Sequence, residues 1–173
     1  MPRARKKKPA FGGERVGTKK SDRRWRTPDG EEWASRFEAQ VYYALKEQGV
    51  NVRRCTSADS MSYTDSVKLG RCPKCGSNEV VTDRRYTADL CVYPDGANDE
   101  ANGRCYFIEA KGYLRADRRR LLRSFAKTGP PIDLRLLFEA DIKVGKGRIT
   151  DWCRSYLKKP CAVWNGKLPE EWR

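Results

Sequence analysis

Glu109 and Lys111 stand two residues apart at the end of an apolar run, "CYFIEAK". Side chains alternate between the two faces of a strand, so both residues are predicted to share a face. Asp89 lies in an earlier apolar run, and the segment between the runs, residues 94–103, is rich in Pro, Gly, Asn and Asp, which favour turns. The two runs are therefore predicted to form an antiparallel hairpin that brings Asp89 opposite residue 108 or 109.

Carboxylates that are this close repel each other unless a cation lies between them, and an all-oxygen site suits Mg²⁺ or Mn²⁺. Lys111, on the same face, can orient or polarise a water beside such a metal. The pattern alone is also consistent with a surface ion-pair cluster, because short charged motifs are common. The sequence contains no histidine, so acid–base chemistry falls to carboxylates, lysine or metal-bound water.

The net charge of +14 predicts a polyanionic partner, and nucleic acid is the leading candidate. Of this charge, +9 precedes residue 27, so residues 1–26 are predicted to form a disordered basic arm whose Lys6, Lys7 and Lys8 bind phosphate. Further DNA contacts are predicted from a helix at 115–127, although such a face is often merely solvated. Its candidate residues are Arg118, Arg119, Arg120 and Arg123.

The remaining patterns predict an α/β domain, residues 27–173, with a mixed central sheet covered by helices on both sides. A first helix is expected to start at Asp29 and Glu32 as a capping pair and to stop at Gly49. Residues 55–85 are polar and without a clear period, so they are predicted to be an insertion looped out of the sheet. A later short helix is expected to be capped by Thr150 or Asp151.

Seven cysteines, an odd number without an export signal, argue against a disulfide framework and for a reducing compartment. The segment "CPKCG" resembles a zinc-knuckle turn, with Cys72 and Cys75 as thiolate ligands and Cys55 as a candidate third. The fourth ligand is open: Asp59, a water or a cysteine of a second subunit. The alternative is a loop of free thiols. No apolar run is long enough to span a bilayer, so we expect a soluble, cytoplasmic protein.

Seven segments in one order resemble the phage endonuclease I family, the Holliday-junction resolvases of T-seven-type short-tailed phages, within the PD-(D/E)xK nuclease superfamily. They are "RFEAQVYYAL", "YTADL", "IEAKG", "DRRRLL", "IDLRLLF", "WCRSYL" and "LPEEW". The resemblance runs from about Arg26 to Trp172 and leaves out the arm and residues 55–85. It departs from the family at Ala88, where the family has proline, and in the cysteine-containing insert.

The resemblance implies a homodimeric, Mg²⁺-dependent endonuclease that cleaves four-way and other branched DNA. It implies catalytic roles for Glu38, Asp89, Glu109 and Lys111, with the three carboxylates as metal ligands. It also implies a domain-swapped dimer in which the N-terminal helix of one chain completes the site of the other. Two alternatives remain open: another PD-(D/E)xK nuclease of restriction or repair type, and a non-catalytic, zinc-containing nucleic-acid-binding protein.

Overall fold

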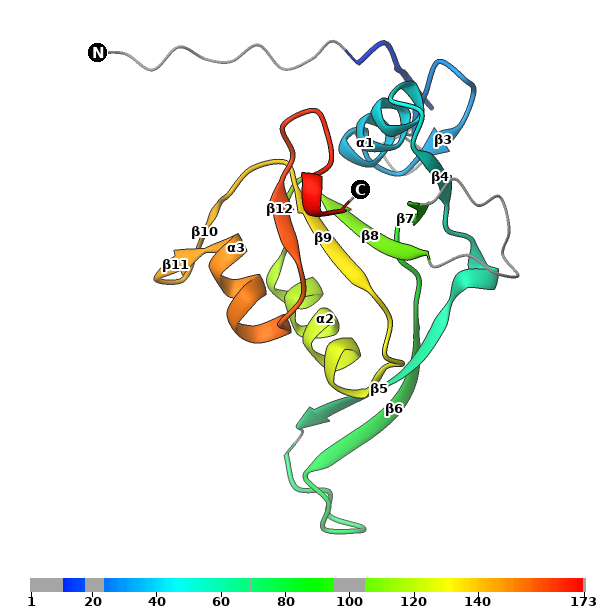
Figure 1. Ribbon diagram of the computed structural model, residues 1–173. Helices are drawn as coiled ribbons and strands as arrows, with labels where there is room; N and C mark the ends of the chain where they lie inside the picture. Colours follow the sequence, from blue (N-terminus) through cyan, green and yellow to red (C-terminus); the bar gives the residue numbers. More distant parts are fainter. Residues whose placement is uncertain (1–10, 18–23, 69, 95–104, 173) are drawn as a thin grey trace.

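The computed structural model describes residues 11–17, 24–68, 70–94 and 105–172. A five-stranded mixed sheet forms its centre, in the order β12-β9-β8-β7-β4 (Figure 1). Strands β4, β7 and β8 pair antiparallel, whereas β8, β9 and β12 pair parallel. The bounds are β4 Asn51–Arg54, β7 Leu90–Tyr93, β8 Tyr106–Lys111, β9 Leu134–Phe138 and β12 Cys161–Val163. The predicted mixed α/β class is confirmed.

Two hydrophobic clusters form because side chains alternate along the strands. Leu90 and Val92 pack in the cluster that contains helix α1 (Arg36–Glu47), and Cys91 and Tyr93 pack in the one that contains helix α2 (Ala116–Thr128). The second cluster also holds α3 (Ile149–Trp152) and the π-helical turn η3 (Cys153–Leu157) that continues it. The sheet is thus covered on both faces.

Helix α1 begins later than predicted, because Ser35 and not Asp29 is its N-cap: the Ser35 side chain accepts a hydrogen bond from the Glu38 amide. Asp29 instead pairs with Lys46 at 2.7 Å, near the other end of the helix. The predicted stop is confirmed, since Gly49 follows the helix with a φ of +72° that a glycine adopts without strain. Helix α3 differs in the opposite direction: it starts earlier than predicted, because Arg148 and not Thr150 or Asp151 occupies its N-cap position.

Part of the predicted disordered arm is folded. Strands β1 (Glu14–Val16), β2 (Arg24–Arg26) and β3 (Glu32–Trp33) form a small antiparallel sheet. Trp25 of β2 lies opposite Trp33, and the Arg36 guanidinium lies 5.5 Å from the Trp25 ring centroid. Through these aromatic contacts the strands pack on the domain. The prediction of disorder was based on net charge, which does not indicate such contacts. Lys6, Lys7 and Lys8 lie outside the described residues.

The insert is also more ordered than predicted, since β5 (Met61–Lys68) and β6 (Glu79–Tyr86) form a long antiparallel hairpin that extends away from the sheet (Figure 1). Asp65 of β5, only 2% exposed, contacts Arg84, Arg120 and Ser124, which fastens the hairpin to α2. Most other hairpin side chains face solvent, so the two strands show no apolar period in the sequence.

Two minor strands, β10 (Lys143–Val144) and β11 (Gly147–Arg148), form a further short hairpin. The 3₁₀ turns are η2 (Ser57–Asp59) and η4 (Glu170–Trp172).

No helix in the described part of the chain is long and apolar enough to cross a membrane.

Candidate active site

Asp89 and Glu109 are neighbours, as the alternation pattern predicted. Leu90 pairs with Ile108, and the Asp89 amide donates to the Ile108 carbonyl at 3.1 Å. In return, the Ala110 amide donates to Oδ2 of Asp89 at 2.8 Å. The Asp89 carboxylate is therefore fixed by the backbone of the neighbouring strand.

Lys111, the last residue of β8, joins three carboxylates. Its Nζ lies 2.8 Å from Oδ2 of Asp89, 3.2 Å from Oε1 of Glu109 and 3.3 Å from Oε1 of Glu38. We call these four residues the carboxylate–lysine cluster. Asp89 and Glu109 come from the central hairpin and Glu38 comes from α1, so residues 73 positions apart meet at one ammonium group.

Glu38 reaches the cluster from the first turn of α1. The Ser35 cap holds the Glu38 backbone, and the buried neighbour Phe37 seats the same turn in the core. By its spacing alone, Glu38 resembles a solvated helix glutamate, but its side chain is only 13% exposed. The resemblance to the phage endonuclease I family, and not the helical pattern, indicates Glu38 as a site residue.

The cluster is largely shielded from water: the side chains of Glu109, Asp89 and Lys111 are 6%, 16% and 19% exposed. Burial, together with the Glu109 carboxylate, raises the pKa of Asp89 well above its usual range. For Lys111, burial opposes the charge, yet the carboxylates of Glu109, Asp89 and Glu38 prevail and raise its pKa. The ammonium is therefore charged, and it balances only one of three negative charges when all are ionised.

This donor set suits a divalent cation, because three carboxylates and one ammonium leave a net charge of −2 when ionised, and oxygen ligands are those that Mg²⁺ prefers. Within the described residues, no group of three or more His, Cys, Asp or Glu side chains is already arranged as a metal site. The Lys111 ammonium contacts all three carboxylates. A bound cation would have to share them with Lys111.

Tyr86, which the sequence analysis did not select, is part of the site. Its hydroxyl donates a 2.7 Å hydrogen bond to Oε2 of Glu109, and its ring packs on Phe125 of α2 with centroids 4.3 Å apart. Burial, followed by the nearby Glu109 carboxylate, raises the Tyr86 pKa, so the phenol stays protonated and can donate. In the sequence, the only indication of this role is that a tyrosine ends a strand three residues before Asp89.

The arginines predicted on α2 have different surroundings. Arg118, Arg120 and Arg123 are exposed, whereas Arg119 is half-buried and donates to the Leu114 carbonyl at 2.8 Å. Arg120 also contacts Asp65 of the insert hairpin at 3.2 Å. Arg120 therefore has a structural partner, and Arg118 and Arg123 present their charge on the surface.

The turn that contains Cys72 and Cys75 supplies at most two thiolate ligands, which is half of a tetrahedral zinc site. The Cys72 carbonyl accepts from the Gly76 amide at 2.9 Å, and backbone hydrogen bonds from Cys75 and Lys74 lower the pKa of the Cys72 thiol. A tetrahedral zinc needs four ligands. Within the described residues, no further His, Cys, Asp or Glu completes the set.

The prediction that Cys55 joins this knuckle is wrong for a single chain. The Cys55 amide donates to the Asp89 carbonyl at the sheet end of the insert hairpin, whereas Cys72 lies at the tip. The hairpin ladder between them has eight pairs, and seven steps of about 3.4 Å separate its ends by about 24 Å. Asp59 is also unsuited, because Arg53 binds its carboxylate at 2.7 and 2.9 Å.

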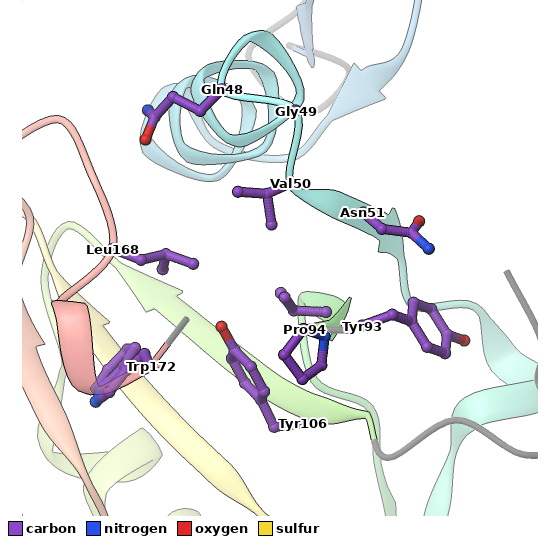
Figure 2. A pocket seen from close by; sticks show the side chains of 10 residues that line it. Gln48, Gly49, Val50, Asn51, Tyr93, Pro94, Tyr106, Leu168 and Trp172 are labelled. Carbon is purple, nitrogen blue, oxygen red and sulfur yellow. The ribbon is translucent and has the colours of Figure 1, made fainter. Parts of the chain in front are cut away.

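A separate, mostly apolar pocket of about 460 Å³ lies between the end of α1 and the C-terminal turn (Figure 2). Val50, Leu168 and Trp172 line it, and the Tyr106 hydroxyl points into it. That hydroxyl is buried without a hydrogen-bond partner among the described residues. None of the carboxylate–lysine cluster lines this pocket, so it is not the candidate site.

Comparisons with protein-family models, with curated proteins and with solved structures find no match to this chain.

Proposed function

We propose that this protein is a metal-dependent DNA endonuclease that hydrolyses phosphodiester bonds at branched DNA. The observation that carries the proposal is the convergence of Glu38, Asp89, Glu109 and Lys111, from a helix and two strands, at the end of β8. Three carboxylates and a lysine that meet in this way provide ligands for a divalent cation beside a cationic group for a phosphate or a water.

Burial distinguishes this arrangement from a surface ion-pair cluster. The four side chains are between 6% and 19% exposed, and exposed ion pairs contribute little to stability. Grouping three carboxylates around one ammonium in a shielded site is costly, since like charges repel and each loses hydration. Buried titratable groups that perturb one another in this way cluster at functional sites, which favours a chemical role.

The residues have separable roles in the proposed reaction. Asp89, Glu109 and Glu38 hold the cation, which would supply Lewis acidity and lower the pKa of a bound water. Lys111 donates hydrogen bonds that orient the attacking water against the phosphate and stabilise charge there. The Tyr86 hydroxyl binds Oε2 of Glu109, which leaves Oε1 of the same carboxylate in contact with Lys111.

Two further arguments favour DNA as the substrate, and branched DNA in particular. The net charge of +14, with Arg118 and Arg123 exposed on the helix that follows β8, favours a phosphate backbone as partner. The preference for four-way junctions and the homodimeric state rest on the resemblance to the phage endonuclease I family. In a homodimer, two sites can make the paired cuts that resolve a junction.

Cleavage of a labelled four-way junction and of a matched linear duplex, each with Mg²⁺ and with EDTA, tests the proposal. We expect metal-dependent cuts near the branch point only. Lys111→Ala and Glu109→Ala should lower the cleavage rate by at least about 10²-fold. Junction binding should persist, because affinity comes from many phosphate contacts. Glu47→Ala, an exposed residue of α1, is the matched control and should cleave normally.

The outcomes separate the alternatives. Equal cleavage of the linear duplex would favour a sequence-reading or repair-type nuclease. Junction binding without any metal-dependent cleavage would reject the enzyme and favour a non-catalytic nucleic-acid-binding protein.

A further inference from the structure

A hollow of about 630 Å³ lies between the start of α2, the turn that joins β10 to β11, and the η3 turn. We call it the basic groove. Its walls carry four cationic and two aromatic side chains, which are Arg119, Arg123, Lys146, Arg148, Trp152 and Tyr156. Asp151 is the one carboxylate that lines it among the described residues, and Oδ2 of Asp151 accepts from the Arg148 amide at 3.1 Å. The charge of the groove is therefore strongly positive.

The aromatic wall is an ordered pair with an open side. The rings of Trp152 and Tyr156 are stacked, with centroids 6.2 Å apart and planes 27° apart. Tyr156 is 63% exposed, so much of its ring that is not covered by Trp152 faces solvent. An aromatic face held in place and left open to solvent is a platform on which a flat ring can stack.

The cationic wall is partly held in position by the backbone. Arg119 donates to the Leu114 carbonyl at 2.8 Å and Arg148 donates to the Asp141 carbonyl at 3.0 Å, and each guanidinium has further N–H groups. Arg123 and Lys146 are exposed. Guanidinium and ammonium groups around an aromatic platform match the two chemical parts of a nucleotide, its phosphate and its base.

The basic groove lies at the same edge of the sheet as the carboxylate–lysine cluster. Lys111 and Phe138 are in register at the ends of the parallel strands β8 and β9. Helix α2 begins five residues after Lys111, and β10 begins five residues after Phe138. Five residues span at most about 18 Å, so a DNA strand at the cluster reaches the groove within a few nucleotides.

We propose that the basic groove binds an unpaired nucleotide of the DNA strand that passes through the active site, and the inference rests on the proposed function. The base stacks on Tyr156, and Arg119, Arg123, Lys146 and Arg148 bind the adjoining phosphates. In a duplex both faces of a base are covered by its neighbours, so an open aromatic platform favours DNA whose bases are unstacked, as at a branch point or a flap.

The test measures binding in EDTA, by fluorescence anisotropy, of a short labelled oligothymidylate and of a blunt duplex. Tyr156→Ala should weaken binding of the oligothymidylate by about 5- to 150-fold, because stacking contributes this much per base, and leave duplex binding unchanged. Tyr156→Phe keeps the ring and should bind normally. Thermal unfolding of each variant shows whether it is folded, which we expect because Tyr156 is exposed.

A charge-matched pair of variants tests the cationic wall. Arg123→Ala should reduce the salt dependence of oligothymidylate binding by about 0.7 in log–log slope, as for one lost phosphate contact. Arg154→Ala, an exposed arginine of η3 that does not line the groove, should change the slope less. Equal effects of the two arginine variants would overturn the inference.

Three other results would overturn it: unchanged oligothymidylate binding in Tyr156→Ala, an equal loss of duplex binding, or tighter binding of oligouridylate than of oligothymidylate. Because the binding assay is done without metal, it can reject nucleotide binding in the basic groove while the proposed nuclease activity is still supported by cleavage. Cleavage can also fail while the groove still selects unpaired DNA, so the two proposals are tested separately.

Discussion

The hydroxyl of Tyr86 lies 2.7 Å from Oε2 of Glu109, which connects the hairpin of β5 and β6 to the carboxylate–lysine cluster. The same hairpin is fastened to α2 through Asp65. The hairpin therefore does more than carry the cysteine turn: Tyr86, the last residue of β6, contacts the carboxylate–lysine cluster.

Tyr86→Phe removes this hydrogen bond and keeps the ring that packs on Phe125. We expect cleavage or apparent Mg²⁺ affinity to fall by about 10- to 100-fold, because groups that orient metal-binding side chains have effects of that size. Mg²⁺ titration of the cleavage rate measures it. Tyr63→Phe is the control, since the Tyr63 ring packs edge-on against the same Phe125. A wild-type titration curve for Tyr86→Phe would contradict the assigned role.

Asp65→Asn should loosen the insert hairpin from α2, since the carboxylate accepts from Ser124 at 2.8 Å and contacts Arg84 and Arg120 at 3.2 Å. Hydrogen bonds to charged groups contribute roughly 1.5–3 kcal/mol, so we expect the free energy of unfolding to fall by about 2 kcal/mol. Amide hydrogen exchange in β5 should also become faster. Asp83→Asn, at an exposed position of the same hairpin, should change neither measurement.

Asp59 should contribute to the acid sensitivity of the protein. Its hydrogen bonds from Arg53 lower the pKa of the Asp59 carboxyl to about 2. A carboxyl with a lowered pKa in the folded state stabilises the fold above its unfolded pKa of about 4, and this contribution is lost as the pH falls toward 2. Urea unfolding of Asp59→Asn should therefore depend less on pH between about 4 and 2 than that of the wild type. An unchanged pH dependence would contradict the Arg53 contact.

We propose that the cysteine turns at the hairpin tips of two chains share one zinc ion, because Cys72 and Cys75 supply two of the four ligands that a tetrahedral site requires. We expect metal analysis of protein purified without chelator to give one zinc ion for every two chains. Cys72→Ser with Cys75→Ser should remove it, and Cys55→Ser should not. One zinc per chain, or none, would contradict a site shared between hairpin tips.

Mixing two inactive variants tests whether active sites are shared between chains. One chain of this structure brings Glu38 to within 3.3 Å of Lys111, so each chain can build a whole site. We therefore expect a heterodimer of Glu38→Ala and Asp89→Ala chains to stay inactive, because each site then carries one lesion. Recovery of nicking activity would instead favour the domain-swapped dimer that the family resemblance implies.

Local patterns in the sequence were sufficient for the central hairpin and for the helix that follows it. Alternation along two apolar runs joined by a turn-rich segment placed Asp89 beside Glu109, and the ladder has that register. Alternation also put Lys111 on the face of Glu109. These relations depend on residues close in the chain and on the period of a strand, so the sequence alone specifies them.

Tertiary packing decided the rest of the site. Glu38 meets Lys111 only because the Ser35 cap and the buried face of α1 fix where the first turn lies against the sheet. Tyr86 reaches Glu109, and Cys55 is held far from Cys72, because the insert forms a paired hairpin whose polar strands show no apolar period. Contacts between distant elements depend on how their faces pack, and no single segment carries that information.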